Sequence, residues 1–136
     1  MWCKLAYSRI LIIDTTKDFP TAAKRFLEAR ENVEAVKTAS KAEALDAACS
    51  FKPDLLLLDI RLLTEDNRER KQGLCLRIKA VMPEISIIAL TLYPEDINAK
   101  ALKGGENIDA VVSRQNFAEE MLLFFKQKGG SCLKRV

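Results

Sequence analysis

The sequence predicts an α/β protein with a (βα)5 arrangement, in which a doubly wound parallel five-stranded sheet forms the middle of a three-layer sandwich. The strongest observation is the apolar run Leu55–Leu58, which is too short for a helix and is typical of a strand buried on both faces. A second apolar run, Ile10–Ile13, also ends in an acid. Segments with strand-like and helical spacing then alternate along the chain, which favours parallel strands joined by helices.

The strands are expected where residues are continuously apolar or alternate with period two. The first opens the fold, the second alternates, and the third is the leucine run with the acid that follows it. The fourth is again continuously apolar, and the fifth is short. The expected strands cover residues 9–14, 33–38, 55–59, 85–91 and 110–112.

The helices are expected between these strands, where apolar residues recur at helical spacing. The first begins near Asp18 and Pro20, because proline fits the first helical turn. The second begins at a capping box formed by Ser40 and Glu43. The third ends before Pro83. The expected helices cover residues 18–31, 40–49, 74–81, 94–103 and 116–126.

Length and composition indicate a single globular domain over residues 1–136, with a core at about 9–127 and a tail at 128–136. The net charge of +3 is spread along the chain, which disfavours direct nucleic-acid binding. The four cysteines lack metal-ligand spacing, and no secretory or membrane segment is found. We therefore expect reduced thiols, a cytoplasmic location and no membrane partner. The absence of histidine excludes Ser-His and Cys-His nucleophile systems and histidine-ligated zinc.

Polar residues follow several of the predicted strands at what would be one edge of the sheet. These residues are Asp14, Asp59 and Thr91, with Ser113 and Arg114 after the last strand. Ligands of open α/β sheets bind outside the carboxyl ends of the strands. A carboxylate there needs water, a metal or a cation, although an acid that only ends its strand is the alternative. The sequence therefore predicts a site centred on Asp59.

The order and placement of three stretches resemble the receiver domain of bacterial response regulators, which has a flavodoxin-like fold. The resemblance runs from Arg9 to about Gln127. The stretches are Ala39–Leu45 with Lys52–Ile60, then Ile87–Thr91, and finally Ala101–Gly105 with Val111–Arg114.

The resemblance implies that Asp59 accepts a phosphoryl group from a histidine kinase or a phosphotransfer protein and so switches protein interactions in a two-component phosphorelay. It implies that Thr91 is the switch hydroxyl and that Arg114 takes the place of the family's lysine. It also implies Mg²⁺ held by Asp14, Asp59 and the backbone carbonyl of Arg61. Such a domain is not an enzyme beyond its own phosphotransfer and autodephosphorylation.

Several residues depart from the family pattern. Thr15 stands where the family has a second acid, which offers Mg²⁺ a neutral oxygen and should weaken its binding. Leu92 is bulky, Val111 replaces an aromatic residue, and the polar loop at 64–73 is long. Two functions stay open: a phosphoacceptor receiver and a pseudo-receiver that binds proteins independently of phosphate. A nucleotide or flavin binder is disfavoured because no glycine cradle follows the first strand.

The last expected helix is apolar on more than one face. Its apolar residues are Phe117, Met121, Leu122, Leu123, Phe124 and Phe125. One stripe facing the sheet cannot hold them all, so either Phe124 or Phe125 is expected to be exposed. The resemblance implies a homodimer or an effector bound through helix four, strand five and helix five, and the alternative is that the tail covers this surface.

Overall fold

The computed structural model describes residues 8–14, 16, 18–30, 33–60, 74–91 and 108–133. Its five strands form one parallel sheet in the order β2-β1-β3-β4-β5. They are β1 (Arg9–Ile13), β2 (Ala35–Ala39), β3 (Leu55–Asp59), β4 (Ser86–Thr91) and β5 (Ala110–Ser113). The first strand lies between the second and the third, so the predicted doubly wound sheet is confirmed.

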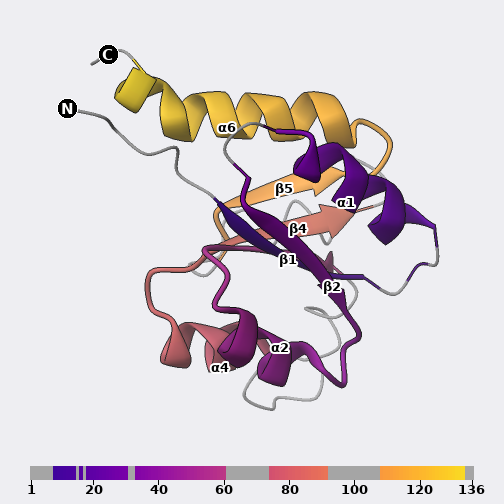
Figure 1. Cartoon of the computed structure of the whole chain (residues 1–136), viewed down its shortest axis with the longest axis vertical. Coiled ribbons are helices and arrows are strands. Elements are labelled where there is room, and N and C mark those ends of the chain that lie inside the picture. Colours follow the sequence, from indigo (N-terminus) through magenta and orange to yellow (C-terminus); the bar gives the residue numbers. More distant parts are fainter. Residues whose placement is uncertain are drawn as a thin grey trace.

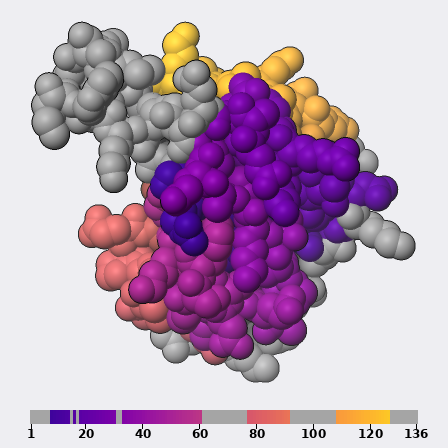
Figure 2. Space-filling model, in the orientation of Figure 1, coloured from indigo at the N-terminus to yellow at the C-terminus, as the bar shows by residue number. Residues whose placement is uncertain are grey.

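Helices cover both faces of the sheet. The described helices are α1 (Phe19–Glu28), α2 (Ala44–Phe51), α4 (Leu74–Val81) and α6 (Phe117–Leu133). Figure 1 shows α1 and α6 on one side of the sheet and α2 and α4 on the other, which confirms the three-layer sandwich. In the space-filling view α6 lies along one end of the molecule beside α1 (Figure 2). The helix expected at 94–103 lies outside the described residues.

Two apolar clusters fill the spaces between the layers. Strand side chains alternate between faces, so Leu56 and Leu58 pack towards α2 and α4, while Leu55 and Leu57 pack towards α1 and α6. All four leucines are fully buried. Burial on both faces explains why this strand shows no polar alternation.

The capping box before α2 forms as predicted. The Ser40 hydroxyl donates to Glu43 Oε1 at 2.9 Å, and the Glu43 backbone N–H donates to Ser40 Oγ at 3.3 Å. The hydrogen bond from the Ser40 side chain, followed by the one from its backbone, lowers the pKa of the Glu43 carboxyl. Cys49 is exposed, because the buried face of α2 is formed by Ala44, Ala47 and Ala48.

Helix α6 corrects one expectation about the surface. Its buried residues Phe117, Met121 and Phe124 recur at helical spacing and pack against the sheet. This orientation turns Leu122 and Leu123 outward, at 43% and 55% exposure. Neither phenylalanine is exposed as predicted, because Phe124 is only 5% exposed and Phe125 is half-buried. The helix also continues to Leu133 instead of ending near 126, because glycine lowers helix propensity without preventing a helix. Within the described residues, no helix is long and apolar enough to cross a membrane.

Asp54 fastens the beginning of β1 to the beginning of β3. Its carboxylate accepts hydrogen bonds from the Ser8 backbone and hydroxyl and from the Arg9 backbone, at 3.0–3.2 Å. Lys52 precedes it in the left-handed conformation, with φ of 54°, and ends α2. The acid before the leucine run therefore has a structural role that its position alone did not reveal.

We predict that Asp54→Ala lowers the free energy of unfolding by about 1–3 kcal/mol, because three part-buried donors lose their acceptor. Urea denaturation monitored by circular dichroism measures the effect. Glu84→Ala, which removes an exposed acid near the same end of the sheet, should change stability by less than about 0.5 kcal/mol. Equal effects of the two substitutions would contradict the role of Asp54.

Candidate functional site

Three charged side chains meet at the carboxyl edge of the sheet. Asp14, Asp59 and Arg114 each stand two positions after a strand residue of the cluster that faces α1 and α6. Because strand side chains alternate with period two, these three begin on the same side of the sheet. The prediction that the residues after these strands meet at one edge of the sheet is therefore confirmed for Asp14, Asp59 and Arg114.

The Arg114 guanidinium bridges the two carboxylates. Its Nε and Nη2 atoms donate to Asp14 Oδ2 at 3.1 and 2.9 Å. The same Nη2 lies 2.9 Å from Asp59 Oδ2. The side chains of both acids are 0% exposed and that of Arg114 is 8% exposed. Arg114 is thus part of a buried ion-pair cluster and is not an exposed arginine.

Hydrogen bonds at the end of β5 fix the backbone position of Arg114. The Arg114 N–H donates to the carbonyl of Thr91 at 2.7 Å. The Ser113 N–H donates to Glu120 Oε1 at 3.0 Å, and the Ser113 hydroxyl accepts from the Asn116 N–H at 3.1 Å. These bonds tie the end of β5 to β4 and to the first turns of α6.

Asp14 is held from its other oxygen by Thr16. The backbone N–H and the hydroxyl of Thr16 both donate to Asp14 Oδ1 at 2.7 Å. An aspartate that binds its own backbone two residues on is a common turn signature. Sequence reasoning missed Thr16 here, although its spacing from Asp14 carried that signal.

An aromatic ring covers the arginine. The Arg114 guanidinium carbon lies 5.5 Å from the centre of the Phe19 ring, within the range of a cation–π interaction. Phe19 in turn meets Phe117 edge-on, with ring centres 5.1 Å apart. Nothing in the sequence indicates that Phe19, the first residue of α1, contacts a charged group.

Thr91 lies at the same edge of the sheet, but its position in β4 faces the other helix layer. It is buried, and it pairs in register with Ser113 at the end of β4. Its position has the parity of the cluster that faces α2 and α4, opposite to that of the charged trio. Thr15, Arg61, Leu92 and the loop at 64–73 lie outside the described residues.

The described side chains do not fit a divalent metal ion in this arrangement. Both oxygens of Asp14 and one oxygen of Asp59 already accept hydrogen bonds or pair with the guanidinium. Among the described residues, no group of three acidic, cysteine or histidine side chains is placed to hold a metal. The site instead brings a permanent protein cation to two carboxylates.

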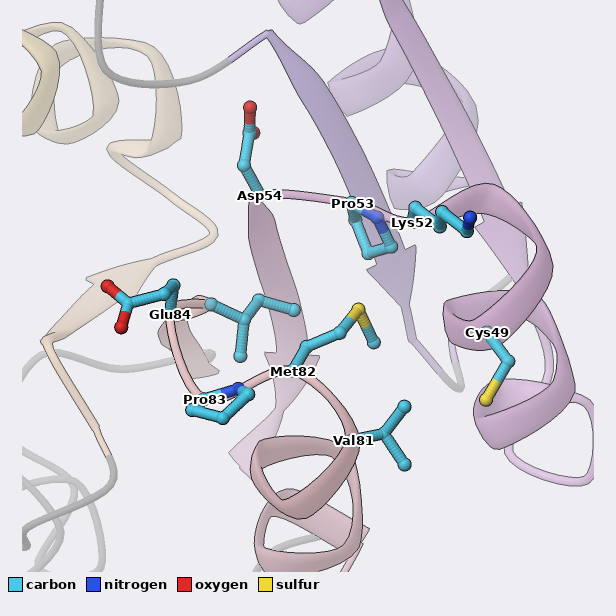
Figure 3. Close-up of a pocket in the computed structure, with 9 residues that line it drawn as sticks. Cys49, Lys52, Pro53, Asp54, Val81, Met82, Pro83 and Glu84 are labelled. Carbon is cyan, nitrogen blue, oxygen red and sulfur yellow. The ribbon is translucent and has the colours of Figure 1, made fainter.

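A cavity of about 450 Å³ lies at the opposite edge of the sheet, before β3 (Figure 3). Cys49, Val81 and Met82 are among its lining residues, and the Asp54 carboxylate points away from Val81 and Met82 (Figure 3). That carboxylate is already bound to the start of β1. Among the described residues that line the cavity, neither Asp54 nor Glu84 forms an ion pair, so the Asp59 edge is the candidate site.

The chain matches the family model of the response regulator receiver domain over residues 10–122. It is 27% identical over 115 residues to the response regulator protein VraR of Staphylococcus epidermidis, a match that covers 83% of this chain and 52% of VraR. The chain therefore spans about half the length of this relative.

Two solved structures are similar across most of the chain. The signal receiver domain of a DNA-binding response regulator from Colwellia psychrerythraea has a TM-score of 0.70 and 25% identity, covering 88% of this chain and 96% of that one. A response regulator from Burkholderia pseudomallei, with a phosphorylated aspartic acid, a calcium ion and citrate, has a TM-score of 0.67 and 26% identity. That match covers 94% of this chain and 71% of the other.

We predict that Arg114→Met lowers the free energy of unfolding by about 3–5 kcal/mol, because it leaves two buried carboxylates without their cation. Chemical denaturation without added divalent ions measures this loss. Arg25→Met is the matched control, since Arg25 is exposed on α1, and it should cost less than about 0.5 kcal/mol. A loss below about 1 kcal/mol for Arg114→Met would show that this ion pair contributes no more than an exposed surface pair.

Proposed function

Because the chain belongs to the response regulator receiver family, we propose that Asp59 accepts a phosphoryl group from a histidine kinase or a phosphotransfer protein. The observation that carries this proposal is the position of Asp59, a buried carboxylate at the carboxyl end of central strand β3, beside Asp14 and a guanidinium. An acid in this position is placed for chemistry at the sheet edge. Phosphorylation would then switch the protein interactions of the domain.

In the proposed reaction an Asp59 oxygen attacks the phosphorus of a phosphohistidine. An O–P bond forms, the P–N bond breaks, and its electron pair returns to the imidazole of the donor. Charge on the phosphoryl oxygens must be stabilised by positioned cations. Arg114 supplies such a cation, and its planar fork suits phosphate geometry. The family resemblance implies that Thr91 then donates a hydrogen bond from its hydroxyl to the bound phosphoryl group.

The family resemblance implied Mg²⁺ at Asp14, Asp59 and the Arg61 carbonyl, but the oxygens of Asp14 and Asp59 that pair with Arg114 are not open to a metal ion in this arrangement. No step of the proposed reaction depends on it, because the described side chains do not present both acids to a metal. The similar Burkholderia pseudomallei regulator supports phosphorylation of an aspartate in this fold.

A second candidate is a phosphorylation-independent pseudo-receiver that acts by protein docking. One specific observation favours it: Asp59 is fully buried and already pairs with Arg114. A donor reaches Asp59 only if this pair rearranges. For the same reason, phosphorylation under the first candidate should be slow.

The proposed partner surface includes the outward part of α6, where the consecutive residues Leu122 and Leu123 are both exposed. Adjacent exposed leucines can mark an interaction site. We infer that this face pairs two copies of the domain or binds an effector, together with β5. We also propose that residues 1–136 form one cytoplasmic receiver domain and that the chain does not contact nucleic acid directly.

We predict that a small phosphodonor adds one phosphoryl group to the wild-type chain slowly, over hours. Intact-protein mass spectrometry, with and without Mg²⁺, measures the adduct. Asp59→Asn should remove it because the amide is not a nucleophile, whereas Asp46→Asn, which changes an exposed acid of α2, should keep it. An adduct on Asp59→Asn would contradict the site, and no adduct on any chain would favour the docking function.

We predict that Leu123→Glu weakens self-association by at least about tenfold, because it places a charge in an apolar contact. Light scattering across a concentration series measures the effect. Ala118→Glu adds the same charge at another exposed position of α6 and should have a smaller effect. A monomeric wild type at all concentrations would remove the homodimer and leave an effector as the partner.

A further inference from the structure

The four acceptor positions of Asp14 are fully used by protein donors. Oδ2 accepts from two nitrogens of Arg114, and Oδ1 accepts from the backbone and the hydroxyl of Thr16. A carboxylate offers about four lone-pair sites. A metal ion could therefore bind Asp14 only after one of these bonds breaks.

One nitrogen of Arg114 occupies the point between the two acids. Its Nη2 lies 2.9 Å from Asp14 Oδ2 and 2.9 Å from Asp59 Oδ2. This nitrogen carries two hydrogens, so it can donate to both carboxylates at once. A cation that bridged Asp14 Oδ2 and Asp59 Oδ2 would have to stand at this same point.

The guanidinium is held there from several sides. The Phe19 ring lies 5.5 Å from its central carbon, and the Arg114 backbone is fixed to Thr91. The side chain is only 8% exposed. Arginine remains positively charged at every ordinary pH, so it repels a second cation throughout.

Mg²⁺ has strict requirements that this arrangement opposes. It needs oxygen ligands at about 2.0–2.1 Å in near-octahedral geometry and gives up its water reluctantly. Expelling the guanidinium to provide those ligands would cost the buried ion pairs of Arg114 with Asp14 and Asp59 and the ring contact with Phe19. The energetic balance therefore favours the internal cation.

We propose that Arg114 is a permanent internal counter-ion that takes the place of a divalent metal between Asp14 and Asp59. The acid pair is then assembled and stabilised without metal, and the resting domain has little affinity for Mg²⁺. This inference concerns the carboxylates of the proposed function but does not require phosphoryl transfer, because metal binding is measured without a phosphodonor.

The test is an Mg²⁺ titration of the full chain, read by calorimetry, by amide NMR shifts and by the melting temperature. Wild type should show no saturable binding at millimolar Mg²⁺ and no metal-dependent change in melting temperature. Arg114→Gln should bind at least about tenfold more tightly and should melt higher with Mg²⁺ than without it, since removing the guanidinium frees carboxylate oxygens.

Two further variants define the site. Arg25→Gln removes an exposed arginine and should behave as wild type. Asp14→Asn, added to Arg114→Gln, should abolish the gained binding, because it removes one of the two carboxylates.

Saturable wild-type binding with shifts at Asp14 and Asp59 would overturn the inference, as would a folded Arg114→Gln that binds no more tightly than wild type. If Arg114→Gln does not fold without metal, folding restored by Mg²⁺ supports the inference, and failure to fold at any Mg²⁺ leaves the wild-type titration to decide. If the Mg²⁺ titrations give the expected results but Asp59 takes no phosphoryl group, only the proposed function is contradicted.

Discussion

The contact of Arg114 with Asp14 and Asp59 is the interaction on which the carboxyl edge of the sheet depends. Removing charges from water costs several kcal/mol for each ion, and only close pairing and further hydrogen bonds compensate. One guanidinium has to compensate two buried carboxylates, so its nitrogens must lie within hydrogen-bond distance of both. Thr16 meets the remaining oxygen of Asp14, and Phe19 covers the arginine. The strand ends and the first turn of α1 therefore place the groups that compensate these buried charges.

The sheet order makes this contact possible. Strands β1 and β3 are neighbours, which brings Asp14 and Asp59 together, whereas β4 separates β5 from β3. A side chain that starts after β5 must extend along the edge, past β4, to reach both acids. Arginine has the length, and its separate Nε and Nη2 donors can bind one acid while touching the other. A lysine has only one nitrogen with which to make these contacts, so it could not hold both acids in the same way.

Most of the fold was predictable from the sequence because it rests on local periodicity. The fully buried leucine run and the strand-end acids marked the sheet and its edge, and the observed strand bounds lie close to those expected. The exposed face of α6 was harder, since consecutive apolar residues from Met121 to Phe125 fit more than one helical orientation. The bridge made by Arg114 was not predictable, because it depends on reach across two strands. The same holds for Phe19, whose neighbour comes from the far end of the chain.

The contact between Arg114 and the Phe19 ring links the site to a distant surface. Phe19 touches both the guanidinium and Phe117, and Phe117 belongs to the same helix as exposed Leu122 and Leu123. If Arg114 has two arrangements and a partner binds α6 with different affinity in each, the partner shifts the populations of the two arrangements. By thermodynamic reciprocity, whatever alters the charge around Asp59 then changes the affinity for that partner by the same factor. Strength of docking on α6 would thus report the state of a carboxylate that solvent does not touch.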